Sequence, residues 1–114
     1  MHNQAAHTVP AEVLAEIVRR IVEVAAPDQI IMFGSAARHT MGPNSDVDLL
    51  VVKRGVFHRR HLAQAIYRRM HGVGQAVDII VVTPEDLDRY RNSPAVVIAP
   101  ALREGSVIYA AHPV

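Results

Sequence analysis

The sequence predicts an α/β fold of the α+β type, in which helices pack a small mixed β-sheet of three to five strands. Three observations lead to this prediction. Apolar residues recur at helical spacing in two long segments, short β-branched runs stand between and after them, and Gly or Pro residues separate the segments. The chain has 114 residues, which suits one domain with a buried core. We therefore expect a flexible tail at residues 1–8 and a single domain at residues 9–114.

The first half of the chain predicts a long helix, two strands and the segments that join them. The helix carries apolar residues on one face with charged residues between them, and Pro27 ends it. Each predicted strand is a short run of apolar, largely β-branched residues. A short helix and a loop are expected between the two strands. In chain order these elements span residues 9–26, 29–33, 35–39, 40–45 and 46–52.

The second half predicts another long helix, a third strand and a mainly helical C-terminal part. Gly72 and Gly74 release the long helix. Thr83 is suited to cap the next helix, because Pro84 and two acids follow it in the first turn. Pro100 is expected to bend or split the last helix. The elements span residues 58–71 and 76–82, a helix that starts at 84, a helix at 93–104 and an edge strand at 106–110.

Composition excludes several classes of function. The net charge of +1 creates no field that would favour nucleic acid or membrane as the main partner. The chain has no Cys, which excludes disulfides and thiolate metal sites. Its apolar runs are far shorter than the roughly 20 residues that a membrane span needs. Residues 1–9 lack the apolar segment of a signal peptide, so we expect a cytoplasmic protein.

The stretch that carries most chemical information begins where the first predicted strand ends. Gly34 and Ser35 are followed by ten residues and then by Asp46, Val47 and Asp48. Side chains alternate along a strand, so the two aspartates point to the same face. Two carboxylates on one face repel each other unless a cation lies between them. The pattern therefore indicates a site for a hard divalent ion such as Mg²⁺, which takes carboxylate and phosphate oxygens.

A third acid lies in the third predicted strand. Asp78 interrupts a β-branched run, where an aspartate is disfavoured unless something holds it. If the second and third strands are neighbours, Asp46, Asp48 and Asp78 meet at one place. Such a cluster suits a pair of Mg²⁺ ions that bind the attacking and leaving oxygens of an in-line phosphoryl transfer.

The segment after the first strand is the predicted phosphate-binding part of the site. A glycine at position 34 lets the backbone come close to a ligand. If residues 35–39 are helical, their free N–H groups face a phosphate, together with the Ser35 hydroxyl. Arg38 is placed to reach the same charge.

Each of these features has an ordinary structural explanation when it stands alone. A Gly-Ser pair after a strand is usually a turn, and an Asp-x-Asp pair is usually a solvated strand end or a cap. A lone strand aspartate more often pairs with Lys or Arg than with a metal. Their common order and spacing favour the functional interpretation, because one mechanism needs all of them.

Other polar groups are interpreted as structural. Asp86 and Asp88 lie in a predicted helix, where residues two apart do not share a face, so they indicate helix-start charge. The His-Arg-Arg-His cluster at 58–61 is more typical of a solvated helix start than of a phosphate or nucleic-acid site. The spacing of the His residues does not favour zinc, and neither a dinucleotide fingerprint nor a P-loop is present. The tyrosines are expected to pack at the edge of the core: Tyr67, Tyr90 and Tyr109.

The sequence Gly-Ser, ten residues and Asp-x-Asp resembles the signature of the nucleotidyltransferase superfamily that includes DNA polymerase β. The chain is most similar to the minimal nucleotidyltransferases (MNT), which are antitoxins encoded beside HEPN toxins, and the resemblance covers nearly its whole length. It implies the nucleotidyltransferase fold, Mg²⁺ bound by the three aspartates, and a triphosphate held by Gly34 and Ser35. It also implies that Asp78 helps to deprotonate the acceptor hydroxyl.

Two positions depart from the family pattern. Members often carry a basic residue directly after Gly-Ser and a Gly after the Arg, where this chain has Ala36 and His39. The missing charge at position 36 is expected to weaken NTP binding or to narrow the choice of NTP. His tolerates a left-handed backbone better than most non-glycine residues, so the turn at position 39 is expected to be kept.

The size of the chain bears on the acceptor. Larger relatives add a helical domain for the base or acceptor, whereas 114 residues leave room for the catalytic core. We therefore expect another chain, or a dimer cleft, to present the acceptor. By resemblance, the partner is a HEPN ribonuclease toxin that receives AMP from ATP on a Tyr.

Two other functions remain open. A catalytically idle antitoxin would neutralise the toxin by binding alone, but the complete acidic set favours an enzyme. Transfer to a small molecule such as an antibiotic is the third hypothesis, and the absence of a second domain argues against it.

Overall fold

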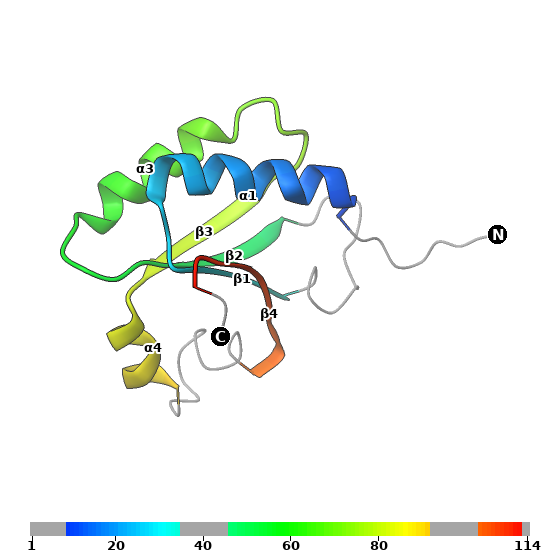
Figure 1. Ribbon diagram of the computed structural model, residues 1–114. Helices are drawn as coiled ribbons and strands as arrows, with labels where there is room; N and C mark the ends of the chain where they lie inside the picture. The colour runs from blue at the N-terminus through cyan, green and yellow to red at the C-terminus, as the bar shows by residue number, and fades with distance from the viewer. Residues whose placement is uncertain (1–8, 35–45, 92–102, 113–114) are drawn as a thin grey trace.

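The computed structural model describes residues 9–34, 46–91 and 103–112. These contain three helices and four strands, shown in Figure 1. Each predicted element within these ranges is present, with ends that differ from the prediction by two residues at most. The predicted helix at 35–39 and nearly all of the one at 93–104 lie outside the described residues. In order, the elements are α1 (Ala11–Ala25), β1 (Gln29–Phe33), β2 (Val47–Val52), α3 (Arg59–Arg69), β3 (Val77–Val82), α4 (Pro84–Tyr90) and β4 (Ser106–Ala110).

The strands form one mixed sheet in the order β3-β2-β1-β4, which confirms the predicted fold class. β1 runs antiparallel to both of its neighbours, β2 and β4. β2 and β3 are parallel, and α3 is the crossover between them, as a parallel connection requires. β4 is an edge strand, as its sequence predicts, and β3 forms the other edge.

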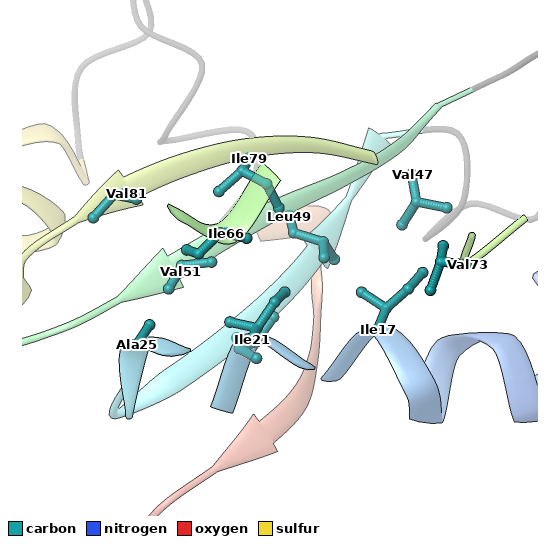
Figure 2. Packing of buried hydrophobic residues seen from close by; sticks show 11 residues of the cluster. Ile17, Ile21, Ala25, Val47, Leu49, Val51, Ile66, Val73, Ile79 and Val81 are labelled. Atoms are coloured by element: carbon teal, nitrogen blue, oxygen red, sulfur yellow. The ribbon is translucent and has the colours of Figure 1, made fainter. Parts of the chain in front are cut away.

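The larger hydrophobic core lies on one face of the sheet, beneath α1 and α3 (Figure 1). The apolar stripe of α1 explains its position, because Ile17 and Ile21 are fully buried and point toward the strands (Figure 2). Ile66 is the corresponding buried residue of α3. The sheet contributes alternate residues to this core, as the pleat requires: Ile30, Val47, Leu49, Val51, Ile79 and Val81.

A smaller core occupies the opposite face. Leu87 of α4 packs there against Leu50, Val52 and Val82, together with two residues of β1. α4 follows the carboxyl end of β3 almost directly, so it covers this face near that end of the parallel strands. The amino ends of β2 and β3, at the other end of the same face, carry the acidic residues of the predicted site.

An ion pair between a half-exposed arginine and a buried aspartate joins the starts of α3 and α4. Thr83 and Asp86 form a reciprocal capping box at the start of α4, and Arg59 reaches Asp86 Oδ2 at 2.5 Å. Asp86 is only 6% exposed, and burial opposes its ionisation. The Arg59 guanidinium and the Thr83 amide outweigh burial and hold the pKa of Asp86 below its ordinary value. The prediction that Asp86 is helix-start charge is confirmed.

This ion pair predicts a pH-dependent contribution to stability. Because the folded pKa of Asp86 is lowered, its contribution is present above the ordinary carboxyl pKa of about 3.9 and is lost as pH falls through the folded value. Asp86→Asn keeps an acceptor for Thr83 but removes the charge. We expect it to lower the free energy of unfolding at pH 7 by about 1–2 kcal/mol, since Arg59 is half exposed. Urea unfolding of wild type and variant at pH 7 and pH 3 measures this difference, which should shrink at pH 3.

Asp88→Asn is the control. Asp88 is exposed and pairs with Arg91 at 3.4 Å within one helical turn. Its loss should change the free energy of unfolding by less than about 0.5 kcal/mol. An Asp86→Asn effect of the same size at both pH values would contradict the proposed role of the pair.

Candidate active site

Alternation along β2 places the first two aspartates of the predicted site. Val47 is fully buried in the larger core, so its neighbours point to the other face of the sheet. Asp48 is partly buried at the start of β2, and Asp46 is exposed just before the strand. The predicted common face of Asp46 and Asp48 therefore follows from the packing of Val47.

The third aspartate is the register partner of the second. β2 and β3 are adjacent, as the sequence hypothesis required, and Asp48 pairs with Asp78 in the parallel ladder. Neighbouring strands lie about 4.8 Å apart, and paired residues of a parallel ladder point to the same face. Asp78 is exposed. Two carboxylates thus stand side by side at the amino ends of two strands.

Gly34 lies at the end of β1, beside the start of β2. β1 ends beside the start of β2, where Phe33 is the antiparallel partner of Asp48. Gly34 follows with a φ of 71°, a left-handed conformation that favours glycine. A Cβ atom at this position would overlap the Asp48 carboxylate, whose Cγ would lie only 3.2 Å away. The sequence predicted close approach to a ligand at Gly34, and the structure adds a close approach to Asp48.

Tyr67 is a site residue that the sequence analysis missed. It is 41% exposed, and its hydroxyl donates a hydrogen bond to Asp78 Oδ1 at 3.1 Å. The same hydroxyl accepts a hydrogen bond from the Ile79 amide at 2.8 Å. We expected Tyr67 to pack at the edge of the core, and the structure instead shows its hydroxyl in polar contacts with β3. No sequence signal indicates it, because the contact depends on how α3 docks beside β3.

The electrostatics of Tyr67 report on the acidic residues around it. Partial burial raises the pKa of its hydroxyl, which the Ile79 N–H lowers in part. The carboxylate of Asp78 raises the pKa further, and so does the charge of Asp46. Asp46 is therefore close enough to act on a group that contacts Asp78.

The donor set fits a hard divalent cation completed by substrate. Asp46, Asp48 and Asp78 offer only carboxylate oxygens, the ligand type that Mg²⁺ prefers. Within the described ranges, no three acidic or imidazole groups are gathered closely enough to hold a metal by themselves. Mg²⁺ commonly uses one or two carboxylates together with substrate phosphates. Metal binding by these residues stays a prediction.

The predicted phosphate-binding residues fall mainly outside the described part of the chain. Gly34 is described, whereas Ser35 and Arg38 lie in the segment 35–45, together with Ala36 and His39. Their roles stay predictions.

The residues interpreted as structural are engaged in local contacts. His58 caps α3 by accepting the His61 amide at 3.2 Å, and the two rings stack. Arg59 is held by Asp86. The cluster at 58–61 thus belongs in part to the start of α3, in line with its structural interpretation.

Comparison with known proteins decides the family. A sequence model of the nucleotidyltransferase domain matches residues 11–104. The chain belongs to the nucleotidyltransferase family. This match spans β1, Gly34 and the three aspartates, so the acidic end of the sheet lies within the family domain. No curated protein is significantly similar to this nucleotidyltransferase in sequence.

Solved structures that share its fold include the following two. One is a Sulfolobus solfataricus protein provisionally described as a nucleotidyltransferase, with a TM-score of 0.61, 22% identity, and coverage of 88% of this chain and 79% of that one. The other is a toxin–antitoxin with AMP-PNP, with a TM-score of 0.59, 22% identity, and coverage of 84% and 72%. Among the helices of the described ranges, none has the length and apolar character needed to cross a bilayer.

The contact of Gly34 with Asp48 predicts a specific mutational coupling. Gly34→Ala introduces both left-handed strain and overlap with the carboxylate. Gly72→Ala is its matched control, since Gly72 has a φ of 77° but no atom near its missing Cβ. We expect Gly72→Ala to cost about 1–2 kcal/mol of unfolding free energy and Gly34→Ala about 1–3 kcal/mol more.

The double variant Gly34→Ala/Asp48→Ala isolates the overlap. Removing the carboxylate should recover most of the excess cost, which chemical denaturation of the four proteins in the cycle measures. If the costs of Gly34→Ala and Asp48→Ala simply add, the close packing of Gly34 on Asp48 is not what excludes a side chain there.

Proposed function

We propose that this nucleotidyltransferase moves a nucleoside monophosphate, AMP from ATP, onto a hydroxyl of another molecule. The observation that carries the proposal is the register of β2 and β3, which brings Asp48 and Asp78 together beside Gly34. The family match supports the reaction class. The toxin–antitoxin structure with AMP-PNP supports an adenine nucleotide.

Each residue has a role in this proposal. Asp46, Asp48 and Asp78 would hold two Mg²⁺ ions, which neutralise the triphosphate and the charge that develops during transfer. Gly34 leaves room beside the carboxylates, and Ser35 and Arg38 bind the phosphates. Asp78 accepts the proton of the acceptor hydroxyl. The acceptor oxygen then forms a bond to the α-phosphorus, the bond between the α-phosphorus and its bridging oxygen breaks, and pyrophosphate leaves.

The proposed acceptor belongs to a partner protein. The second solved structure is a toxin–antitoxin, which supports an antitoxin role. The resemblance to minimal nucleotidyltransferases narrows the partner to a HEPN-type toxin and the acceptor to one of its Tyr hydroxyls. Both proteins would act in the cytoplasm. The partner would place the hydroxyl within about 3 Å of the α-phosphate, where positioning contributes most to the rate.

Nucleotide binding should depend on the metal. Three acids beside an anionic triphosphate repel it unless a cation stands between them. Isothermal titration calorimetry should therefore show much tighter binding of ATP with millimolar Mg²⁺ than with excess chelator. Equal affinity under both conditions would remove the metal from the proposal.

Transfer should be detected on the partner. The protein is incubated with Mg²⁺, ATP and the toxin encoded beside it, and both chains are weighed by intact mass spectrometry. We expect AMP on the toxin and at least a hundredfold lower rate with Asp46→Asn or Asp78→Asn, on the order expected when a group needed for transfer is lost. Asp88→Asn is the matched control, because it removes one exposed carboxylate of another Asp-x-Asp and should leave the rate unchanged.

Two other results would replace this proposal. Toxin neutralisation that persists without any mass shift, also in Asp46→Asn and Asp78→Asn, would make the chain an antitoxin that acts by binding alone. Modification of a small hydroxylated molecule such as an antibiotic, but not of the toxin, would make it a small-molecule nucleotidyltransferase.

A further inference from the structure

We propose that Tyr67 is a positioning residue, whose hydroxyl holds the Asp78 carboxylate in the orientation needed to act on the acceptor. The inference rests on the proposed function, because it assigns Tyr67 to the same reaction. Tyr67 does not bind the nucleotide in this proposal. It acts through Asp78.

The first argument is the direction of the hydroxyl. β3 is an edge strand, and its Ile79 amide donates to Tyr67 Oη at 2.8 Å. With this amide bound to the oxygen, the one hydroxyl proton is free to turn toward Asp78 Oδ1, 3.1 Å away. The Tyr67 hydroxyl therefore links the backbone amide of Ile79 to the carboxylate of Asp78, one residue earlier in the same strand.

The second argument is that Asp78 needs such support. Asp78 is exposed, so packing does not select its rotamer. The hydrogen bond from Tyr67 to Oδ1 restricts the rotation of the carboxylate and leaves Oδ2 outside this contact. Hydrogen bonds of this kind orient metal-binding and proton-accepting carboxylates, and their loss typically reduces metal affinity or activity by about 10–100-fold.

The third argument is that Tyr67 stands on a rigid support. The preceding residue, Ile66, is fully buried in the larger core. Arg20 of α1 donates to the carbonyl oxygens of Arg69 and His71 at 2.8 and 2.6 Å, which fixes the end of α3. Positions held by packing and hydrogen bonds on a helix can orient a site group closely.

Tyr67→Phe tests this role, because it removes one oxygen and keeps the ring. In the transfer assay we expect kcat to fall about tenfold while the KM for ATP changes less than about twofold. Tyr90→Phe removes the same atom from a tyrosine that packs against the smaller core, and it should leave both constants unchanged. Unchanged kcat in Tyr67→Phe, with transfer abolished in Asp78→Asn, would overturn the positioning role and leave the proposed function standing.

A second readout does not need catalysis. Titration of Mg²⁺ into protein with the non-hydrolysable analogue AMP-PNP gives the Mg²⁺ concentration for half-maximal nucleotide binding. Tyr67→Phe should raise it about three- to tenfold in the wild-type background and leave it unchanged in Asp78→Asn, because Tyr67 acts through that carboxylate. Equal effects in both backgrounds would overturn the inference.

Two measurements separate the remaining outcomes. Amide hydrogen exchange at Ile79 should be faster in Tyr67→Phe, and unchanged exchange would contradict the hydrogen bond on which the inference depends. AMP attached to Tyr67 itself would also overturn it, since Tyr67 would then be an acceptor. If no acceptor is modified by the wild-type protein but the Mg²⁺ titration shows the expected coupling, the proposed transfer fails and the support of Asp78 by Tyr67 remains.

Discussion

The parallel, in-register pairing of β2 with β3 is the interaction on which the candidate site depends. It makes Asp48 and Asp78 partners in the ladder and sets their spacing by the distance between strands. A slip of one residue would turn one of the two carboxylates to the opposite face, among the buried residues of the larger core. Val47, Leu49 and Val51 oppose such a slip, because they are fully buried beneath α1 and α3. The chemistry of one face is therefore fixed by the packing of the other.

The two aspartates at the amino ends of β2 and β3 also account for the residues that contact them, Gly34 and Tyr67. Like charges on adjacent strands destabilise a sheet unless something compensates them. Gly34 gives the Asp48 carboxylate room by having no side chain, and Tyr67 gives Asp78 a hydrogen bond. A cation at this end of the sheet would offset the remaining repulsion, as the proposed binding of a nucleotide together with its metal requires.

Much of the fold could be predicted because its determinants are local. The spacing of Ile17 and Ile21 predicts α1, and the Thr83-Pro84 start predicts α4, where the capping box is present. The sequence also singles out three acids, because carboxylates are out of place in apolar strands, and their roles stay predictions. The order of the strands could not be derived from periodicity, since pairing between β1 and β4 joins residues far apart in the sequence.

Other features lay beyond sequence reasoning for a different reason. The hydrogen bond between Tyr67 and Asp78 joins α3 to β3 at the edge of the sheet. Helical periodicity predicts that the neighbouring Ile66 is buried, but it does not predict the contact of Tyr67. The overlap that excludes a side chain at Gly34 likewise comes from the neighbouring strand. Both contacts depend on how separate helices and strands pack together, and both involve residues of the candidate site.

The hydroxyl of Tyr67 also has a consequence for the solubility of the protein. An edge strand with unpaired N–H groups is a template for another chain, and parallel edges made of β-branched residues are prone to such pairing. β3 has this composition, and Tyr67 occupies the Ile79 amide at the point where the strand reaches the site. Exchange of the tyrosine for phenylalanine would therefore leave the Ile79 amide without this partner at the same time as it removes the hydrogen bond to Asp78.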